Sequence, residues 1–128
     1  MKKTASERDG KSLRVLVVDD NPHVLAALTD LFEDERGVHV VGATLHVDDA
    51  ITIAILQRPD VVLVDVHMPG GGGQRVVAAI REVFPEVRIV ALSAAFDQDD
   101  ISSMLATGAD MCFSKSADFD SLLRSITP

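Results

Sequence analysis

The stretch VVLVDVHMPGGGG, residues 61–73, shows how this chain is expected to fold. Four branched apolar residues lead directly into Asp65, and the chain then breaks at Pro69 and at a run of four glycines. A short apolar run between turn signals is typical of a strand that is buried on both faces. An ionised carboxylate at the rim of such a core is costly unless other groups compensate its charge. The rest of the chain is therefore expected to bring compensating groups to Asp65.

Similar apolar runs recur along the chain and alternate with amphipathic segments. The predicted strands are residues 13–19, 38–44, 60–65, 87–93 and 111–114. The apolar stripes of the predicted helices lie around 24–32, 50–55, 76–84, 101–105 and 119–126. Five strands that alternate with five helices predict an α/β fold, in which a parallel sheet is covered on both faces.

The composition fits one globular domain in a reducing compartment. A length of 128 residues suffices to bury a core, and the net charge of -8 argues against a nucleic-acid footprint on this chain itself. The single cysteine, Cys112, excludes an internal disulfide and suits the cytoplasm. No apolar run has the length of a membrane span, and residues 1–12 lack the apolar segment of a signal peptide. We expect a flexible tail at 1–12 and one domain at 13–128.

Polar residues gather where the predicted strands end. Four of the five strands lead into Asp19 and Asp20, Asp65, Ser93 and Lys115. Ligands of an open parallel sheet bind beyond these carboxyl ends. Three neighbouring carboxylates repel one another, and Mg²⁺ is a natural compensation because it prefers oxygen ligands and leaves positions for phosphate oxygens. Asp65 is then a candidate nucleophile for phosphoryl transfer, with a hydroxyl and an ammonium placed to hold the other phosphate oxygens.

These residues give the chain a strong resemblance to the receiver domain of two-component response regulators. The resemblance covers about 13–127 and rests on the acidic pair after LRVLVV, on VVLVDVHMPG, on VALSA and on GADMCFSKS. It implies the flavodoxin-like, doubly wound fold of five parallel strands in the order 2-1-3-4-5 with five helices. DVHMPGGGG and GADMCFSKSAD are also similar to the subgroup that carries a C-terminal helix-turn-helix domain of the LuxR/NarL type.

The resemblance implies a signalling switch that assists its own phosphotransfer and dephosphorylation, rather than a conventional enzyme. Asp65 would accept a phosphoryl group from a sensor histidine kinase, Ser93 would hydrogen-bond this group, and Lys115 would pair with it. The output would be transcriptional and would act through an effector domain. A homodimer would form through the face of the predicted helices 101–105 and 119–126 with strand 111–114, or through the predicted helices 24–32 and 119–126. No membrane partner is implied.

The resemblance also implies a ligand set for Mg²⁺. Asp20 and Asp65 would bind the metal directly, the backbone carbonyl of His67 would be the third protein ligand, and Asp19 would help through water. His67 stands two residues after Asp65, at a position where the residue type is expected to alter how fast the phosphoryl group is lost.

Two positions near Lys115 depart from the family pattern. Cys112 stands where the family usually has an aromatic residue that turns inward on activation, so this aromatic is missing or has moved to Phe113. Ser116 stands where the family commonly has a proline in a cis bond. These departures concern the form of the switch and leave the predicted phosphorylation residues in place.

Other functions share parts of the same pattern. A pseudo-receiver that no longer takes phosphate is one alternative, although all the expected residues are present. A hydrolase of the haloacid dehalogenase type would need an acidic residue where His67 stands, and a flavodoxin-like carrier would lack Trp and Tyr to stack on a flavin. Taken singly, Asp20 or Asn21 followed by Pro22 predicts a capped helix start, and the glycines 70–73 predict a flexible connection without the lysine of a P-loop.

Overall fold

The computed structural model describes residues 12–94 and 98–127, so the predicted tail at 1–12 lies almost wholly outside the described residues. The strands are β1 (Leu13–Val18), β2 (Val38–Thr44), β3 (Val61–Asp65), β4 (Arg88–Ser93) and β5 (Met111–Ser114). The helices are α2 (Pro22–Glu33), α3 (Val47–Gln57), α4 (Gly72–Val83), α5 (Gln98–Thr107) and α6 (Phe119–Ile126), with a 3-10 turn, η1, at Pro69–Gly71. Within the described ranges, no helix has the length and apolar character needed to cross a membrane.

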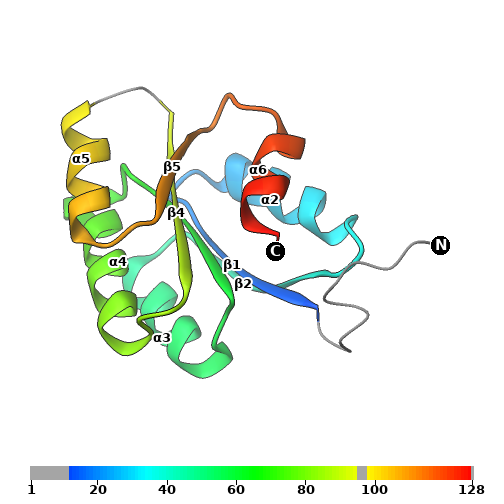
Figure 1. Ribbon diagram of the computed structural model, residues 1–128, viewed down its shortest axis with the longest axis horizontal. Coiled ribbons are helices and arrows are strands. Elements are labelled where there is room, and N and C mark those ends of the chain that lie inside the picture. Colours follow the sequence, from blue (N-terminus) through cyan, green and yellow to red (C-terminus); the bar gives the residue numbers. More distant parts are fainter. Residues whose placement is uncertain (1–11, 95–97, 128) are drawn as a thin grey trace.

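The strands form one parallel sheet in the order β2-β1-β3-β4-β5, which confirms the predicted order. Helices α2 and α6 lie on one face of the sheet, and α3, α4 and α5 lie on the other (Figure 1). The predicted strands 13–19, 60–65 and 87–93 are each one residue longer than the observed strands, and the other two agree. The reversal of strand order beside β1 places the carboxyl ends of β1 and β3 next to each other, where a ligand site is expected.

The apolar core is divided by the sheet into two clusters. Val62 and Val64 of β3 belong to the cluster under α3, α4 and α5, whereas Val61 and Leu63 belong to the cluster under α2 and α6. Successive side chains of a strand point to opposite faces, so a central strand covered by helices on both sides must be apolar at every position. This double burial explains why the run before Asp65 does not alternate with polar residues.

Helix α2 is capped by Asn21, one of the two caps that its sequence predicts. The Asn21 side chain accepts hydrogen bonds from the backbone N–H groups of His23 at 2.9 Å and Val24 at 3.3 Å, and Pro22 occupies the first helical position. Asp20 is therefore not the cap of this helix. The acidic pair instead lies between the end of β1 and the capped start of α2.

The glycine run forms a turn and the start of a helix, so the prediction that all four glycines connect to the helix is wrong for Gly72 and Gly73. Gly70 and Gly71 have φ angles of 66° and 69°, a region that residues with a Cβ adopt at a cost, and they form the turn of η1. Gly72 and Gly73 are buried and begin α4. A Cβ atom on Gly73 would lie 2.5 Å from the carbonyl oxygen of Asp65. The absence of a side chain thus lets α4 start directly against the end of β3.

Candidate functional site

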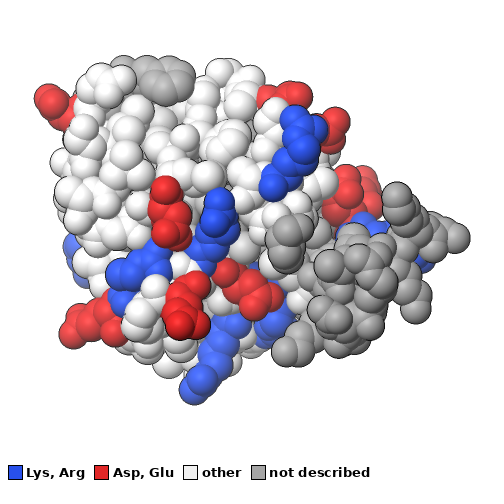
Figure 2. Space-filling view, viewed as in Figure 1, with Lys and Arg blue, Asp and Glu red and all other residues white. Residues whose placement is uncertain are grey.

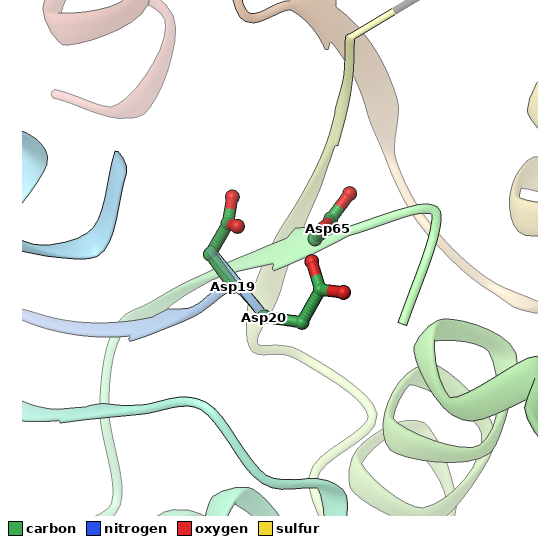
Figure 3. A group of neighbouring side chains, drawn as sticks. All are labelled: Asp19, Asp20 and Asp65. Atoms are coloured by element: carbon green, nitrogen blue, oxygen red, sulfur yellow. The ribbon is translucent and has the colours of Figure 1, made fainter. Parts of the chain in front are cut away.

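The sheet brings the predicted acidic residues together at its carboxyl edge. Asp19 and Asp20 follow β1, and Asp65 is the last residue of the neighbouring strand β3. Each of the three carboxylates places an oxygen within 4.8 Å of the other two. Figure 3 shows the three side chains turned toward a common space above the strand ends. Asp19 and Asp65 are buried and Asp20 is exposed, so the cluster opens to solvent on one side.

Lys115 closes the buried side of this cluster. Its Nζ lies 2.7 Å from Oδ2 of Asp19 and 3.3 Å from Oδ2 of Asp65. Its backbone N–H donates to the carbonyl of Ser93 at 2.8 Å, which ties the residue after β5 to the last residue of β4. Ser93 itself is buried at the same edge. The structure therefore gathers all the predicted side chains, from four different strands, at one end of the sheet.

The charges in the cluster hold Asp65 in its ionised form. Burial alone would raise the pKa of Asp65, but the His67 N–H at 3.0 Å, the hydrogen bond with Asp20 and the Lys115 ammonium together lower it. The hydrogen bond with Asp65 raises the pKa of Asp20, and burial and the charges of Asp65 and Asp19 act in the same direction. Burial disfavours the charged form of Lys115, yet its contacts with Asp19 and Asp65 raise its pKa. Asp65 is consequently a carboxylate at neutral pH.

The donor set fits a divalent cation. Oδ2 of Asp19 is buried, and its partner among the described residues is the single ammonium of Lys115, which also faces Asp65. Oδ1 of Asp19 accepts the N–H of Asn21 at 2.9 Å. In the part of the chain that the structure describes, the Lys115 ammonium is the one cation in contact with the three carboxylates, so negative charge is left uncompensated where Asp20 meets solvent. Carboxylate oxygens in excess of local positive charge are the ligands that Mg²⁺ prefers.

His67 contacts the site through its backbone and a helix through its side chain. Its N–H donates to Oδ1 of Asp65, and its Nε2 lies 3.5 Å from Oδ2 of Asp100 in the first turn of α5. The role of the His67 backbone carbonyl as a metal ligand stays a prediction. The contact with Asp100 was missed by the sequence interpretation, because an acidic residue in a first helical turn is common without any such partner.

The residues around Lys115 decide between the two alternatives for the missing aromatic. Cys112 packs against the cluster under α3, α4 and α5, where burial raises the pKa of its thiol, whereas Phe113 packs against the opposite cluster. Phe113 therefore lies on the wrong face of β5 to replace an aromatic residue at Cys112, and the idea that the aromatic has moved there is wrong. The described residues contain no cis peptide bond, so Ser116 follows Lys115 through a trans bond.

The family model of the response regulator receiver domain matches residues 15–127. The chain belongs to this family. Response regulator GacA of Pseudomonas aeruginosa is 30% identical to the receiver domain over 114 residues, which cover 89% of this chain. The match covers 53% of GacA, so the receiver domain spans about half the length of this curated relative. The predicted family resemblance is thereby confirmed.

Solved structures agree with this assignment. A two-component response regulator of the LuxR family from Aurantimonas sp. SI85-9A1 superposes on the receiver domain with a TM-score of 0.82 at 27% identity, covering 91% of this chain and 83% of that chain. A response regulator from Burkholderia pseudomallei, with a phosphorylated aspartic acid, a calcium ion and citrate, has a TM-score of 0.78 at 26% identity. This second match covers 89% of this chain and 66% of that chain.

Proposed function

We propose that this receiver domain is a phosphorylation-dependent switch of a two-component system, with Asp65 as the phosphoacceptor. The observation that carries this proposal is the setting of Asp65. It is an ionised carboxylate at the end of a central strand, held by the His67 N–H and the Lys115 ammonium beside two further carboxylates. The phosphorylated aspartic acid of the Burkholderia pseudomallei regulator supports the same chemistry on this fold.

The proposed donor is a phosphohistidine of a sensor histidine kinase. An oxygen of Asp65 forms the new P–O bond while the P–N bond to the imidazole breaks and its electron pair stays on the nitrogen. Lys115, 3.3 Å from Oδ2 of Asp65, pairs with the phosphoryl oxygens. Ser93, at the end of the neighbouring strand β4, is proposed to hydrogen-bond the group and report its presence. The product is an acyl phosphate on Asp65.

The acidic cluster is the proposed site for Mg²⁺. Asp20 and Asp65 would hold the ion together with the backbone carbonyl of His67, and Asp19 would help through water. The buried Oδ2 of Asp19, which shares its one ammonium with Asp65, supports this assignment. The ion, when bound, would offset the charge of the carboxylates and of the incoming phosphoryl oxygens.

The proposed output is transcriptional regulation in the cytoplasm, through an effector domain of the LuxR/NarL type. The family name of the Aurantimonas sp. SI85-9A1 regulator supports this subgroup. On the face shown in Figure 2, basic side chains lie beside acidic ones and form no continuous basic patch. The net charge of -8 supports the assignment of DNA contact to the effector domain. Phosphorylation is proposed to reshape the α5–β5–α6 face, with a homodimer through it or through α2 and α6.

Incubation with Mg²⁺ and acetyl phosphate is expected to add one phosphoryl group to the chain, as measured by intact mass. EDTA should remove this gain, because the carboxylates and the donor then repel each other without compensation. If no adduct forms and the donor is not consumed, the chain is a pseudo-receiver. Steady consumption of the donor without an adduct would instead support a hydrolase.

Asp20→Asn is expected to stabilise the metal-free protein at neutral pH. A carboxyl whose pKa is raised by folding destabilises the fold while it is ionised, and this cost disappears as the pH falls through the folded pKa to the unfolded pKa. Because Asp20 is exposed, the gain should be at most about 1 kcal/mol. Urea unfolding in EDTA should show the gain at neutral pH and a smaller one near about pH 4. Added Mg²⁺ should stabilise the wild type more than the variant; equal stabilisation would contradict the metal assignment.

A further inference from the structure

The turn that carries Lys115 is braced by hydrogen bonds on both sides of the lysine. It comprises residues 114–117 and is closed by the Ala117 N–H, which donates to the carbonyl of Ser114 at 3.0 Å. Lys115 lies inside this turn, and its own N–H is bonded to Ser93 of β4. The path of the backbone through the turn thus sets the direction in which the lysine side chain leaves the sheet.

The Ser114 hydroxyl is hydrogen-bonded to Ser116, on the other side of Lys115. Its Oγ accepts the N–H of Ser116 at 3.1 Å and lies 2.7 Å from Oγ of Ser116. Serine hydroxyls that bond the backbone two residues ahead stabilise such turns. No proline restricts the backbone between residues 114 and 117. The two hydrogen bonds of Ser114 join the residues on either side of Lys115.

Lys115 needs such a brace because its side chain is long and its ammonium must contact two neighbouring carboxylates at once. A lysine loses considerable rotamer entropy when its ammonium is held in one place, and a small rotation of the backbone moves Nζ away from both carboxylates. Nζ is nevertheless held at 2.7 Å from Asp19 and at 3.3 Å from Asp65.

We propose that Ser114 is a positioning residue for Lys115. By bonding Ser116 on the far side of the lysine, the Ser114 hydroxyl keeps the turn in the conformation that directs Nζ to Asp19 and Asp65. This inference rests on the proposed function, in which Lys115 assists phosphoryl transfer to Asp65. A cavity of about 270 Å³, lined in part by Ser114, Lys115 and Ala117, adjoins the turn. Ser114→Thr keeps a hydroxyl at this position and is the conservative variant.

A double-mutant cycle with Lys115 tests this role, with phosphorylation by acetyl phosphate as the readout. Ser114→Ala is expected to slow the reaction about fivefold to tenfold. Ser114→Thr should restore a rate near that of the wild type. In a Lys115→Ala background, Ser114→Ala should cause little further slowing, because residues that act through each other are not additive. Ser125→Ala is the matched control, since its hydroxyl also makes a hydrogen bond to the backbone, donating to the carbonyl of Leu122 at 2.6 Å within α6.

Equal slowing in the two backgrounds would reduce Ser114 to a general structural role and overturn the inference. A threonine variant as slow as the alanine variant would do the same. Ser116→Ala removes only one of the two hydrogen bonds, so about twofold slowing that depends on Lys115 is expected even if Ser114→Ala folds poorly. A wild type that accepts no phosphoryl group would overturn the proposed function and this inference together. A phosphorylated wild type with an unaffected Ser114→Ala variant would overturn the inference alone.

Discussion

Asp65→Asn is expected to abolish the phosphoryl adduct while leaving the fold intact. An amide nitrogen or oxygen does not form a stable acyl phosphate, whereas the ionised carboxylate of Asp65 is the proposed nucleophile. The amide oxygen can still accept the N–H of His67, which donates to Asp65 at 3.0 Å. Removal of the charge weakens one contact with Lys115 but also relieves repulsion from Asp19 and Asp20, so the net effect on stability should be small. Intact mass with acetyl phosphate and Mg²⁺ measures the adduct.

Asp49→Asn is the matched control for this experiment. Asp49 is an exposed carboxylate in the first turn of α3, away from the carboxylate cluster, and its variant should be phosphorylated as the wild type is. Urea unfolding of both variants checks that the fold is retained. A full adduct on Asp65→Asn would show that another carboxylate accepts the phosphoryl group, with Asp20 the first to be examined by peptide mapping.

Gly73→Ala is expected to slow phosphorylation roughly 10- to 100-fold, because it would displace the backbone that carries the phosphoacceptor. The new Cβ would lie 2.5 Å from the carbonyl oxygen of Asp65 and 3.1 Å from that of Val66. Alanine favours a helix over glycine by about 1 kcal/mol, so helix propensity alone predicts a gain in stability. We expect the clash to outweigh this gain and to leave a net loss of about 1–2 kcal/mol. Urea unfolding and the rate of adduct formation measure the two effects.

Gly70→Ala separates the close contact from the loss of a glycine as such. Gly70 has a φ of 66°, but a Cβ there would meet no atom within 4 Å. This variant should lose about 1 kcal/mol through backbone strain, while phosphorylation stays near the wild-type rate. If Gly73→Ala were as stable as the wild type and as fast, α4 would not be packed against Asp65 in solution as described.

Much of the fold could be predicted because its signals are local. Apolar runs of strand length, helical stripes between them and the glycines and prolines at their ends indicated a doubly covered parallel sheet. The same logic placed Asp65 and Lys115 at one edge, since all strands of a parallel sheet end on the same side. The Asn21 cap was predictable for a similar reason, because a cap and its helix are adjacent in sequence.

The packing of the glycines and of β5 could not be predicted in this way. Nothing local distinguishes Gly70, which needs a positive φ, from Gly73, which needs the space of a missing Cβ beside Asp65. Cys112 and Phe113 lie on opposite faces because they are neighbours in a strand, but which helices cover each face of β5 is decided by the tertiary structure. The contact of His67 with Asp100 joins two segments that the sequence separates by a strand and a helix.

The sequence by itself determined the order of the elements and the residue types at the strand ends, because hydrophobic periodicity and turn chemistry act over a few neighbouring residues. Only the tertiary structure decided that the pKa of Asp65 is lowered while that of Asp20 is raised, since the Lys115 ammonium and the neighbouring carboxylates come from separate segments. It also decided the position of the Lys115 ammonium, which follows from a turn braced by Ser114 and tied to β4. Electrostatic contacts of this kind form only when strands distant in sequence become neighbours in the sheet.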